Sequence, residues 1–180
     1  MMTVVVMSLA LFGCLWGQAS LPAVPLLAYA KPPLLLALTV YYALNHPPPA
    51  ALGAAVAAGF LQDAYDGVPL GYSALVFCAV AAGINTFRGT LLSEAPVTQI
   101  FFGSAGAAFM TAALYGLLVK DGLLHISPTM LGLKIIGTTL LATVSTPPVC
   151  AGIAALDRFA GNIMSNDVNV EAHGLGQTLG

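Results

Sequence analysis

Residues 59–75 read GFLQDAYDGVPLGYSAL, in which Asp63, Asp66, Gly67, Pro69 and Gly71 stand between two apolar runs. This pattern predicts the end of one helix, a tight turn and the start of the next helix. Gly67 is suited to the left-handed conformation that ends many helices. Pro69 fixes its own φ as the next helix approaches, and Gly71 permits a backbone contact where a side chain would clash.

Asp63 lies in the last turn of the first of these two helices, near the edge of an apolar segment. A carboxylate in that position is costly without a partner. Three roles are open: contact with a partner or ligand, hydrogen bonds from the free amides of the following helix, and simple hydration beside Asp66. Arg88 is not expected to pair with Asp63, because a helix of about 27 Å separates it from Leu70.

The composition is that of a membrane protein. Of the 180 residues, 58% are hydrophobic and only 7% are charged, whereas soluble domains carry about 25% charged residues. This balance excludes a soluble enzyme, a basic nucleic-acid binder and a disordered acidic chain. The net charge of −2 says little about partners.

Charged residues divide the chain into apolar segments that are each long enough to cross a bilayer. These segments are 1–30, 32–62, 67–87, 95–119 and 135–156. Pro47, Pro48 and Pro49 interrupt the second segment, because consecutive prolines break a helix. We therefore predict a compact all-α bundle of six transmembrane helices, with five as the alternative and with a short second and third helix. The expected helices are at about 3–20, 33–45, 50–63, 70–88, 96–119 and 130–156.

The last helix contains Pro147 and Pro148, and these predict a kink or break near Thr146. Ser145 and Thr146 are expected to bond the freed carbonyls. Residues 1–160 are expected to form one transmembrane domain, followed by a flexible polar tail over 161–180. The lysines and arginines do not decide the orientation, because they are nearly balanced between the two sides.

Small residues spaced four apart predict close contacts between helices. The third expected helix carries two such pairs and the fifth carries one. The pairs are Gly53 with Ala57, Ala55 with Gly59, and Gly103 with Ala107.

No residue pattern predicts catalysis, a metal site or a cofactor. The cysteines lie singly in apolar runs, and the histidines are dispersed, with no nucleophile or carboxylate at motif spacing. These residues are Cys14, Cys78, Cys150, His46, His125 and His173. Leu11–Cys14 loosely resembles a lipoprotein cleavage box, but no Lys or Arg precedes it, and an uncleaved first helix is the preferred interpretation.

The run from Gly59 through Asp63 to Leu75 resembles the signature of the bacterial rod shape-determining protein MreD family. The matching positions are Gly59, Asp63, Gly67, Val68, Pro69, Leu70, Gly71, Ala74 and Leu75. The segments Lys31–Leu36 and Tyr41–Leu44 are similar to that family's entry into its second helix. The resemblance covers residues 30–90 by motif and the remainder by hydropathy and length. The triple proline and the absence of Lys or Arg before the first helix depart from the family pattern.

The resemblance implies a non-enzymatic scaffold of the cell-elongation machinery in the bacterial inner membrane, with both termini in the cytoplasm. Its implied partner is the single-span protein MreC, which connects it to MreB filaments and to the peptidoglycan synthases. The motif of Gly59, Asp63, Gly67, Pro69, Leu70 and Gly71 is then the expected structural and partner-contact element.

A second hypothesis is a substrate-binding membrane component of a vitamin-type uptake transporter, because the MreD family is similar in its six-helix fold to those components. Such a component needs a cavity with convergent polar groups. The fifth and sixth helices offer few candidates for that cavity, which argues against this hypothesis. The candidates are Thr111, Tyr115, Ser127, Thr138 and Thr139. An orphan membrane enzyme is a third and weaker hypothesis, since no motif supports it.

Overall fold

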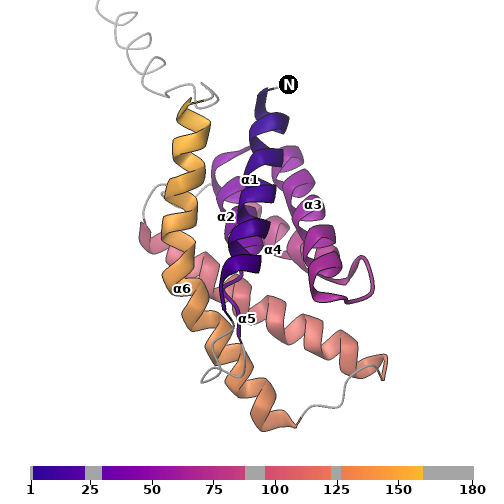
Figure 1. The fold of residues 1–180 in the computed structure, drawn as a ribbon. Coiled ribbons are helices and arrows are strands. Elements are labelled where there is room, and N and C mark those ends of the chain that lie inside the picture. The colour runs from indigo at the N-terminus through magenta and orange to yellow at the C-terminus, as the bar shows by residue number, and fades with distance from the viewer. Residues whose placement is uncertain (1, 23–29, 88–95, 123–126, 160–180) are drawn as a thin grey trace, which may run out of the picture.

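The computed structural model describes residues 2–22, 30–87, 96–122 and 127–159, and within these ranges the chain forms six helices and no strand (Figure 1). The helices are α1 (Met2–Ser20), α2 (Leu34–Asn45), α3 (Pro48–Asp66), α4 (Tyr72–Phe87), α5 (Pro96–Lys120) and α6 (Pro128–Phe159). The predicted all-α class and six-helix order are confirmed. Arg88, His125, His173 and the expected tail over 161–180 lie outside the described residues.

The three prolines separate α2 from α3, as predicted, but they do not shorten α3. Pro47 is extended at φ −63° and ψ 153°, and Pro48 and Pro49 occupy the first positions of the helix. The amide hydrogens that these prolines lack have no partner in a first helical turn, so their absence costs nothing there. The expected short third helix is therefore wrong, because α3 begins earlier, ends later and has 19 residues.

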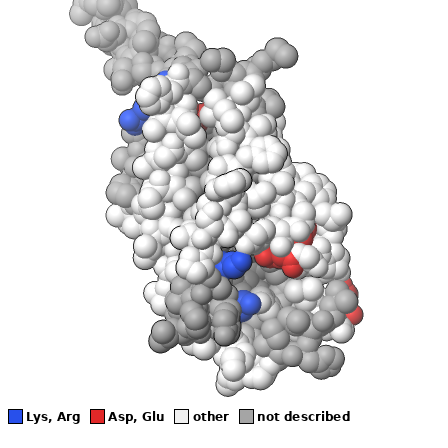
Figure 2. Space-filling model, viewed as in Figure 1, with Lys and Arg blue, Asp and Glu red and all other residues white. Residues whose placement is uncertain are grey.

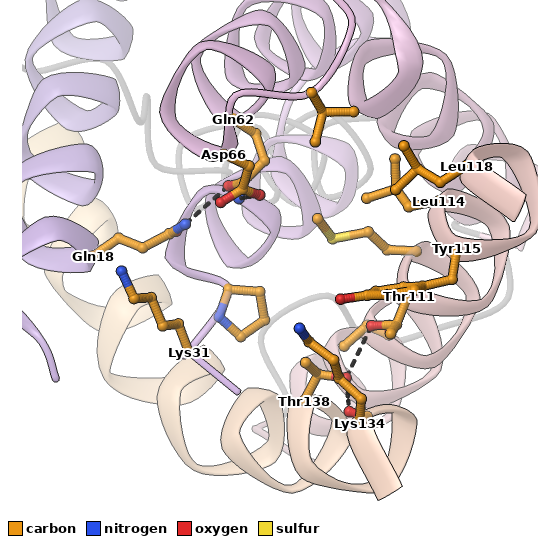
Figure 3. A pocket seen from close by; sticks show the side chains of 14 residues that line it. Gln18, Lys31, Gln62, Asp66, Thr111, Leu114, Tyr115, Leu118, Lys134 and Thr138 are labelled. Carbon is orange, nitrogen blue, oxygen red and sulfur yellow. Dashed lines mark hydrogen bonds between the residues drawn. The ribbon is translucent and has the colours of Figure 1, made fainter. Parts of the chain in front are cut away.

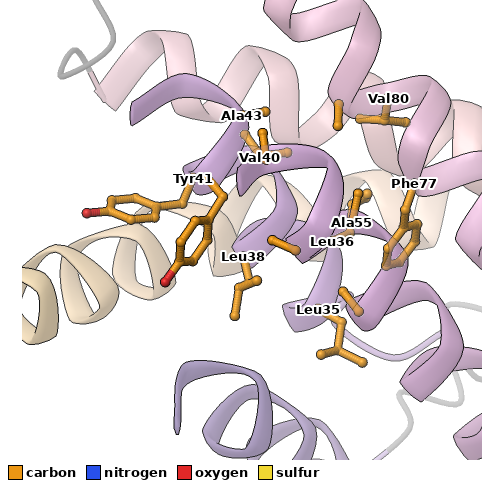
Figure 4. Packing of buried hydrophobic residues seen from close by; sticks show 14 of the residues in the cluster. Leu35, Leu36, Leu38, Val40, Tyr41, Ala43, Ala55, Phe77 and Val80 are labelled. Carbon is orange, nitrogen blue, oxygen red and sulfur yellow. The ribbon is translucent and has the colours of Figure 1, made fainter. Parts of the chain in front are cut away.

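The short helix α2 is the centre of the bundle. All of its residues from Leu34 to Leu44 are buried, and it packs against each of the other five helices. Figure 4 shows its leucines and Val40 beside Phe77 and Val80 of α4. A helix that is apolar all round is suited to such an enclosed position.

The long helices α5 and α6 pack against each other and extend past the ends of α1 and α3 (Figure 1). Gly103 of α5 lies at a point where the two helices touch. A β-carbon added at Gly103 would collide with the side chain of Thr146, at 2.9 Å from its Cβ. Gly103 therefore has the helix-packing position expected from the sequence.

The helix α6 passes through Pro147 and Pro148 without interruption and bends along its length (Figure 1). Of the predicted kink or break near Thr146, the break is therefore wrong, because α6 is continuous and bends instead (Figure 1). The prolines free the carbonyls of Thr143 and Val144, but the Thr146 hydroxyl donates to the Ala142 carbonyl at 2.7 Å instead. The Ser145 hydroxyl has no hydrogen-bond partner within the described ranges. Packing against α5 and α2 holds the helix together where its own hydrogen bonds are missing.

Two helices are long and apolar enough to cross a membrane, over Val97–Lys120 and Pro128–Phe159. Three others are apolar but shorter, namely Val5–Ser20, Leu34–Asn45 and Tyr72–Phe87. The predicted count of six or five spans stays a prediction for the helices other than α5 and α6. Large apolar side chains cover the outside, including Trp16 at 79% exposure and Val144 at 75%.

Candidate functional site

The corner between α3 and α4 is held by the side chain of Asp63. Its Oδ2 accepts a hydrogen bond from the Gly71 amide at 2.6 Å, and its Oδ1 accepts one from the Ser73 amide at 2.9 Å. Amides at the start of a helix have no partner within the helix, and they favour negative charge. The carboxylate is fully buried. Of the three roles considered for Asp63, the geometry is that of an internal lock.

The main chain of Asp63 also closes the turn. Its carbonyl oxygen accepts hydrogen bonds from the amides of Gly67 and Val68, the second at 3.2 Å. Gly67 has φ 66° and ψ 27°, which confirms the predicted left-handed helix end. The helix end and the carboxylate therefore fix the direction of α4 together.

Gly71 is required for a reason that differs from the predicted clash. A β-carbon at this position would meet no atom within 4 Å, so the expectation of a close backbone contact is wrong. The residue has φ 108°, which side-chain-bearing residues rarely adopt. The turn therefore needs glycine for its backbone conformation.

The small residues named from the sequence lie in different surroundings. A β-carbon at Gly59 would collide with the main chain of Ala74 on α4, so Gly59 allows α3 and α4 to touch. Gly53 lies on the outer face of α3, where a β-carbon would meet no atom within 4 Å, and it makes no close helix contact inside the described chain. Ala107 is buried on α5.

The remaining members of the motif form an exposed tip. Gly67 and Pro69 are exposed, and the side chain of Leu70 is 70% exposed. The motif thus divides into a buried frame, made of Gly59 and Asp63, and an apolar tip that the frame holds in place.

A cavity of about 380 Å³ lies beside this corner, where α1, α3, α5 and α6 meet (Figure 3). Ala107 lines it, together with residues that the sequence reasoning did not connect. The other lining residues are Gln18, Lys31, Pro33, Gln62, Asp66, Val68, Met110, Thr111, Leu114, Tyr115, Leu118, Lys134 and Thr138. Three of the five polar residues considered on the fifth and sixth helices are among them.

Two amide side chains link three helices at the edge of this cavity. Gln18 Nε2 donates to Gln62 Oε1 at 3.0 Å, and Gln62 Nε2 donates to Asp66 Oδ2 at 2.6 Å. Gln18 Oε1 accepts from the Leu34 amide at the start of α2, at 3.1 Å. Both amides are buried, and these bonds satisfy them inside the protein.

Charged side chains gather in one region of a face that is otherwise almost free of charge (Figure 2). Lys31 and Lys134 both line the cavity, as does Asp66. Lys31 Nζ donates to the Tyr65 hydroxyl at 2.6 Å, and Lys134 Nζ lies 5.1 Å from the centroid of the Tyr115 ring.

A second buried carboxylate, that of Asp157, lies at the C-terminal end of α2. Asp157 on α6 accepts a hydrogen bond from the Tyr41 hydroxyl at 2.8 Å, and its Oδ2 lies 3.1 Å from His46 Nε2. The His46 ring stacks on Tyr42 with centroids 4.7 Å apart. The sequence reasoning missed this cluster, because His46 and Asp157 are 111 residues apart and no local pattern connects them.

The described residues contain no group of three or more His, Cys, Asp and Glu side chains that could hold a metal ion. Both buried carboxylates are used in contacts that hold helices together. The arrangement therefore offers a fixed corner, an exposed apolar tip and a cavity, and it brings no nucleophile and base together.

A comparison with models of known protein families identifies the family of this chain. The family model described as rod shape-determining protein MreD matches residues 1–145. The chain belongs to the MreD family. The resemblance inferred from the Gly59–Leu75 run is thereby confirmed. The match includes the whole corner and all of the cavity lining, and Asp157 lies beyond it. Neither the curated proteins nor the solved structures contain a match to this chain.

Family membership gives this MreD-family protein a role in rod-shape determination. The family is a family of membrane proteins and is not a known enzyme family. The apolar helices α5 and α6 agree with that membrane character.

Proposed function

We propose that this MreD-family protein is a multi-pass scaffold of the bacterial inner membrane, with both termini in the cytoplasm. It maintains rod shape by binding the single-span protein MreC, and it thereby links MreB filaments to the peptidoglycan synthases. The family match supports the role in cell shape. The partner contacts are inferred from the corner described above.

The observation that carries the proposal is the exposed apolar tip on a locked frame. The side chain of Leu70 is 70% exposed, and Phe60 on α3 and Leu75 on α4 are exposed as well. Asp63 and Gly59 hold the turn rigid, so little freedom is lost when a partner helix packs against it. Small-residue packing and complementary apolar shape are the means by which membrane helices associate.

Catalysis at this corner is disfavoured by the same geometry. Both oxygens of Asp63 accept amide hydrogen bonds and the side chain is fully buried. A general acid or base has to reach the group with which it exchanges a proton. Asp63 therefore stabilises the fold, and the exposed tip contacts the partner.

Co-purification with the MreC-like partner from detergent tests the proposal. Leu70→Ala should reduce recovery of the partner about tenfold, since truncating a central apolar anchor costs roughly 1–2 kcal/mol. Val144→Ala is the matched control, because Val144 is 75% exposed on α6. Equal recovery with both variants would remove Leu70 from the interface.

The cavity favours a second candidate, a substrate-binding membrane component of a vitamin-type uptake transporter. Thr111, Tyr115 and Thr138 line it, so the polar groups that such a component needs do converge. A vitamin-sized molecule that co-purifies in stoichiometric amounts would support this candidate. Purified protein without such a molecule, and without affinity for one, would count against it.

A further inference from the structure

The cavity between α1, α3, α5 and α6 is amphipathic, and the scaffold role does not use it. Its volume of about 380 Å³ falls within the range of small-molecule sites, about 300–1,000 Å³. The wall formed by α5 is apolar, with Met110, Leu114 and Leu118. Lys31 lies across the cavity from this wall, whereas Lys134 extends from α6 beside Tyr115, and Figure 3 shows its ammonium directed into the opening.

Each lysine is held over an aromatic ring. Lys31 Nζ lies 4.9 Å from the centroid of the Tyr65 ring and donates to its hydroxyl. Lys134 Nζ lies over the Tyr115 ring. The rings fix the two positive charges in place without neutralising them. An ammonium has three donors, so each lysine keeps donors for a further acceptor.

The charges that line the cavity do not balance. Two ammonium groups face one carboxylate, that of Asp66, which leaves a formal charge of +1. Within the described ranges no carboxylate oxygen lies within 4 Å of either lysine nitrogen, and the one contact at salt-bridge distance there joins His46 to Asp157, outside the cavity lining. Both lysines are half-buried. Two half-buried positive charges that share one carboxylate favour an anionic ligand.

Most of the other polar groups of the lining are already satisfied. Gln18 and Gln62 bond each other, the α2 amide and Asp66. The Thr111 hydroxyl donates to the Ala107 carbonyl and lies 2.9 Å from the Thr138 hydroxyl. Among the described lining residues, the groups with spare donors include the two ammonium groups and the Tyr115 hydroxyl, and of these only the ammonium groups carry charge. Recognition in this cavity therefore depends on negative charge more than on a pattern of neutral hydrogen bonds.

Apolar surface continues outside the cavity on the side of Lys134. Leu133 and Met130 precede it on α6 and are 42% and 58% exposed. A whole phospholipid is larger than the cavity, but its head group fits, and its acyl chains would lie along these exposed side chains. An anionic group joined to an apolar body matches both parts of the site.

We propose that this cavity binds the phosphate-bearing head group of an anionic lipid, with Lys31 and Lys134 donating to the phosphate oxygens and α5 contacting the adjoining apolar part. The shared chemistry is a phosphate group, which a soluble phosphate compound also carries. The lipid is favoured by the apolar α5 wall and by the exposed apolar side chains of α6. This inference does not depend on the binding of MreC.

The test is native mass spectrometry of the full chain released from nanodiscs that contain equal amounts of phosphatidylglycerol and phosphatidylcholine. We expect retention of phosphatidylglycerol over phosphatidylcholine. The double variant Lys31→Gln/Lys134→Gln should lose that preference, by about tenfold for each ammonium removed. Lys120→Gln is the matched control, because Lys120 is exposed at the end of α5 and lies outside the cavity lining.

Two further measurements distinguish loss of binding from misfolding, and a lipid from a soluble phosphate compound. Lys134→Arg retains the positive charge and should keep the preference, whereas Lys134→Gln removes no hydrogen bond within the described residues and should weaken it. Equal retention of both lipids by the wild-type chain would overturn the proposal. Equal loss in the Lys120→Gln control would also overturn it. Binding of inorganic phosphate without any lipid preference would overturn the lipid assignment. Recovery of the MreC-like partner is measured separately, so its failure is distinguishable from failure here.

Discussion

The Tyr41 hydroxyl donates a 2.8 Å hydrogen bond to Asp157, which lies 116 residues further along the chain. This contact ties the end of α2 to the end of α6. His46 approaches the same carboxylate oxygen, Oδ2, while Oδ1 has no hydrogen-bond partner within the described ranges. A buried carboxylate depends strongly on the few donors that it has.

Tyr41→Phe should therefore lower the free energy of unfolding by about 1–2 kcal/mol, because it removes one of those donors without changing the size of the ring. The measurement is the thermal unfolding of the purified protein in detergent. Tyr115→Phe is the matched control, since the Tyr115 hydroxyl makes no hydrogen bond to the described residues. Equal unfolding temperatures for the two variants would contradict a stabilising role for the Tyr41 hydroxyl.

Asp63→Ala should be more costly, at about 2–4 kcal/mol, because it leaves the amides of Gly71 and Ser73 without their acceptors. Asp66→Ala, three residues further on, should cost less, about 1 kcal/mol, since Asp66 is exposed and its loss leaves one donor, Gln62 Nε2, without its acceptor. Unfolding temperature and recovery of folded protein by size exclusion are the two readouts. If Asp66→Ala were the more damaging change, Asp63 would not be the lock of the corner.

Two glycines of α3 provide an internally matched pair. Gly59→Ala drives a β-carbon into the main chain of Ala74 and should separate α3 from α4, so we expect a loss of several kcal/mol or no folded protein. Gly53→Ala meets no atom and should be neutral or stabilise the helix by up to about 1 kcal/mol. Thermal unfolding of the two variants side by side decides this, and a similar loss in both would be inconsistent with the packing described.

Substitutions of Gly71 separate backbone strain from steric clash. Because no atom lies near a β-carbon there and φ is 108°, Gly71→Ala and Gly71→Leu should cost a similar amount, about 1–3 kcal/mol. A clash would instead make leucine far worse than alanine. Gly67→Asn should be well tolerated, because asparagine accepts the left-handed conformation. Unfolding midpoints of the three variants are the measurement.

The sequence predicted the helices well because charges and prolines mark their ends directly. It located α2 and α5 almost to the residue, and it identified Asp63 as a candidate lock. It misjudged the prolines at the start of α3, which fit a first helical turn and do not shorten the helix. At Pro147 and Pro148 it predicted a kink or a break, and the break is wrong because neighbouring helices hold α6 together while it bends (Figure 1).

The cavity and the Asp157 cluster were beyond sequence reasoning for a different reason. Lys31 and Lys134 lie about a hundred positions apart, and their common environment depends on how α1, α3, α5 and α6 meet. In the sequence, Asp157 is only a charge near the end of the last helix. Contacts of that kind depend on the packed bundle and carry no local pattern.

The enclosed position of α2 has a consequence for biosynthesis. With 12 residues this helix is about 18 Å long, and every neighbour it needs except α1 is translated after it. A nascent chain that has emerged only as far as α4 still presents part of α2 to lipid or to the insertion machinery. The enclosure of α2 is therefore complete only after α6 has left the ribosome. A chain that terminates before α6 should be a substrate for membrane proteases.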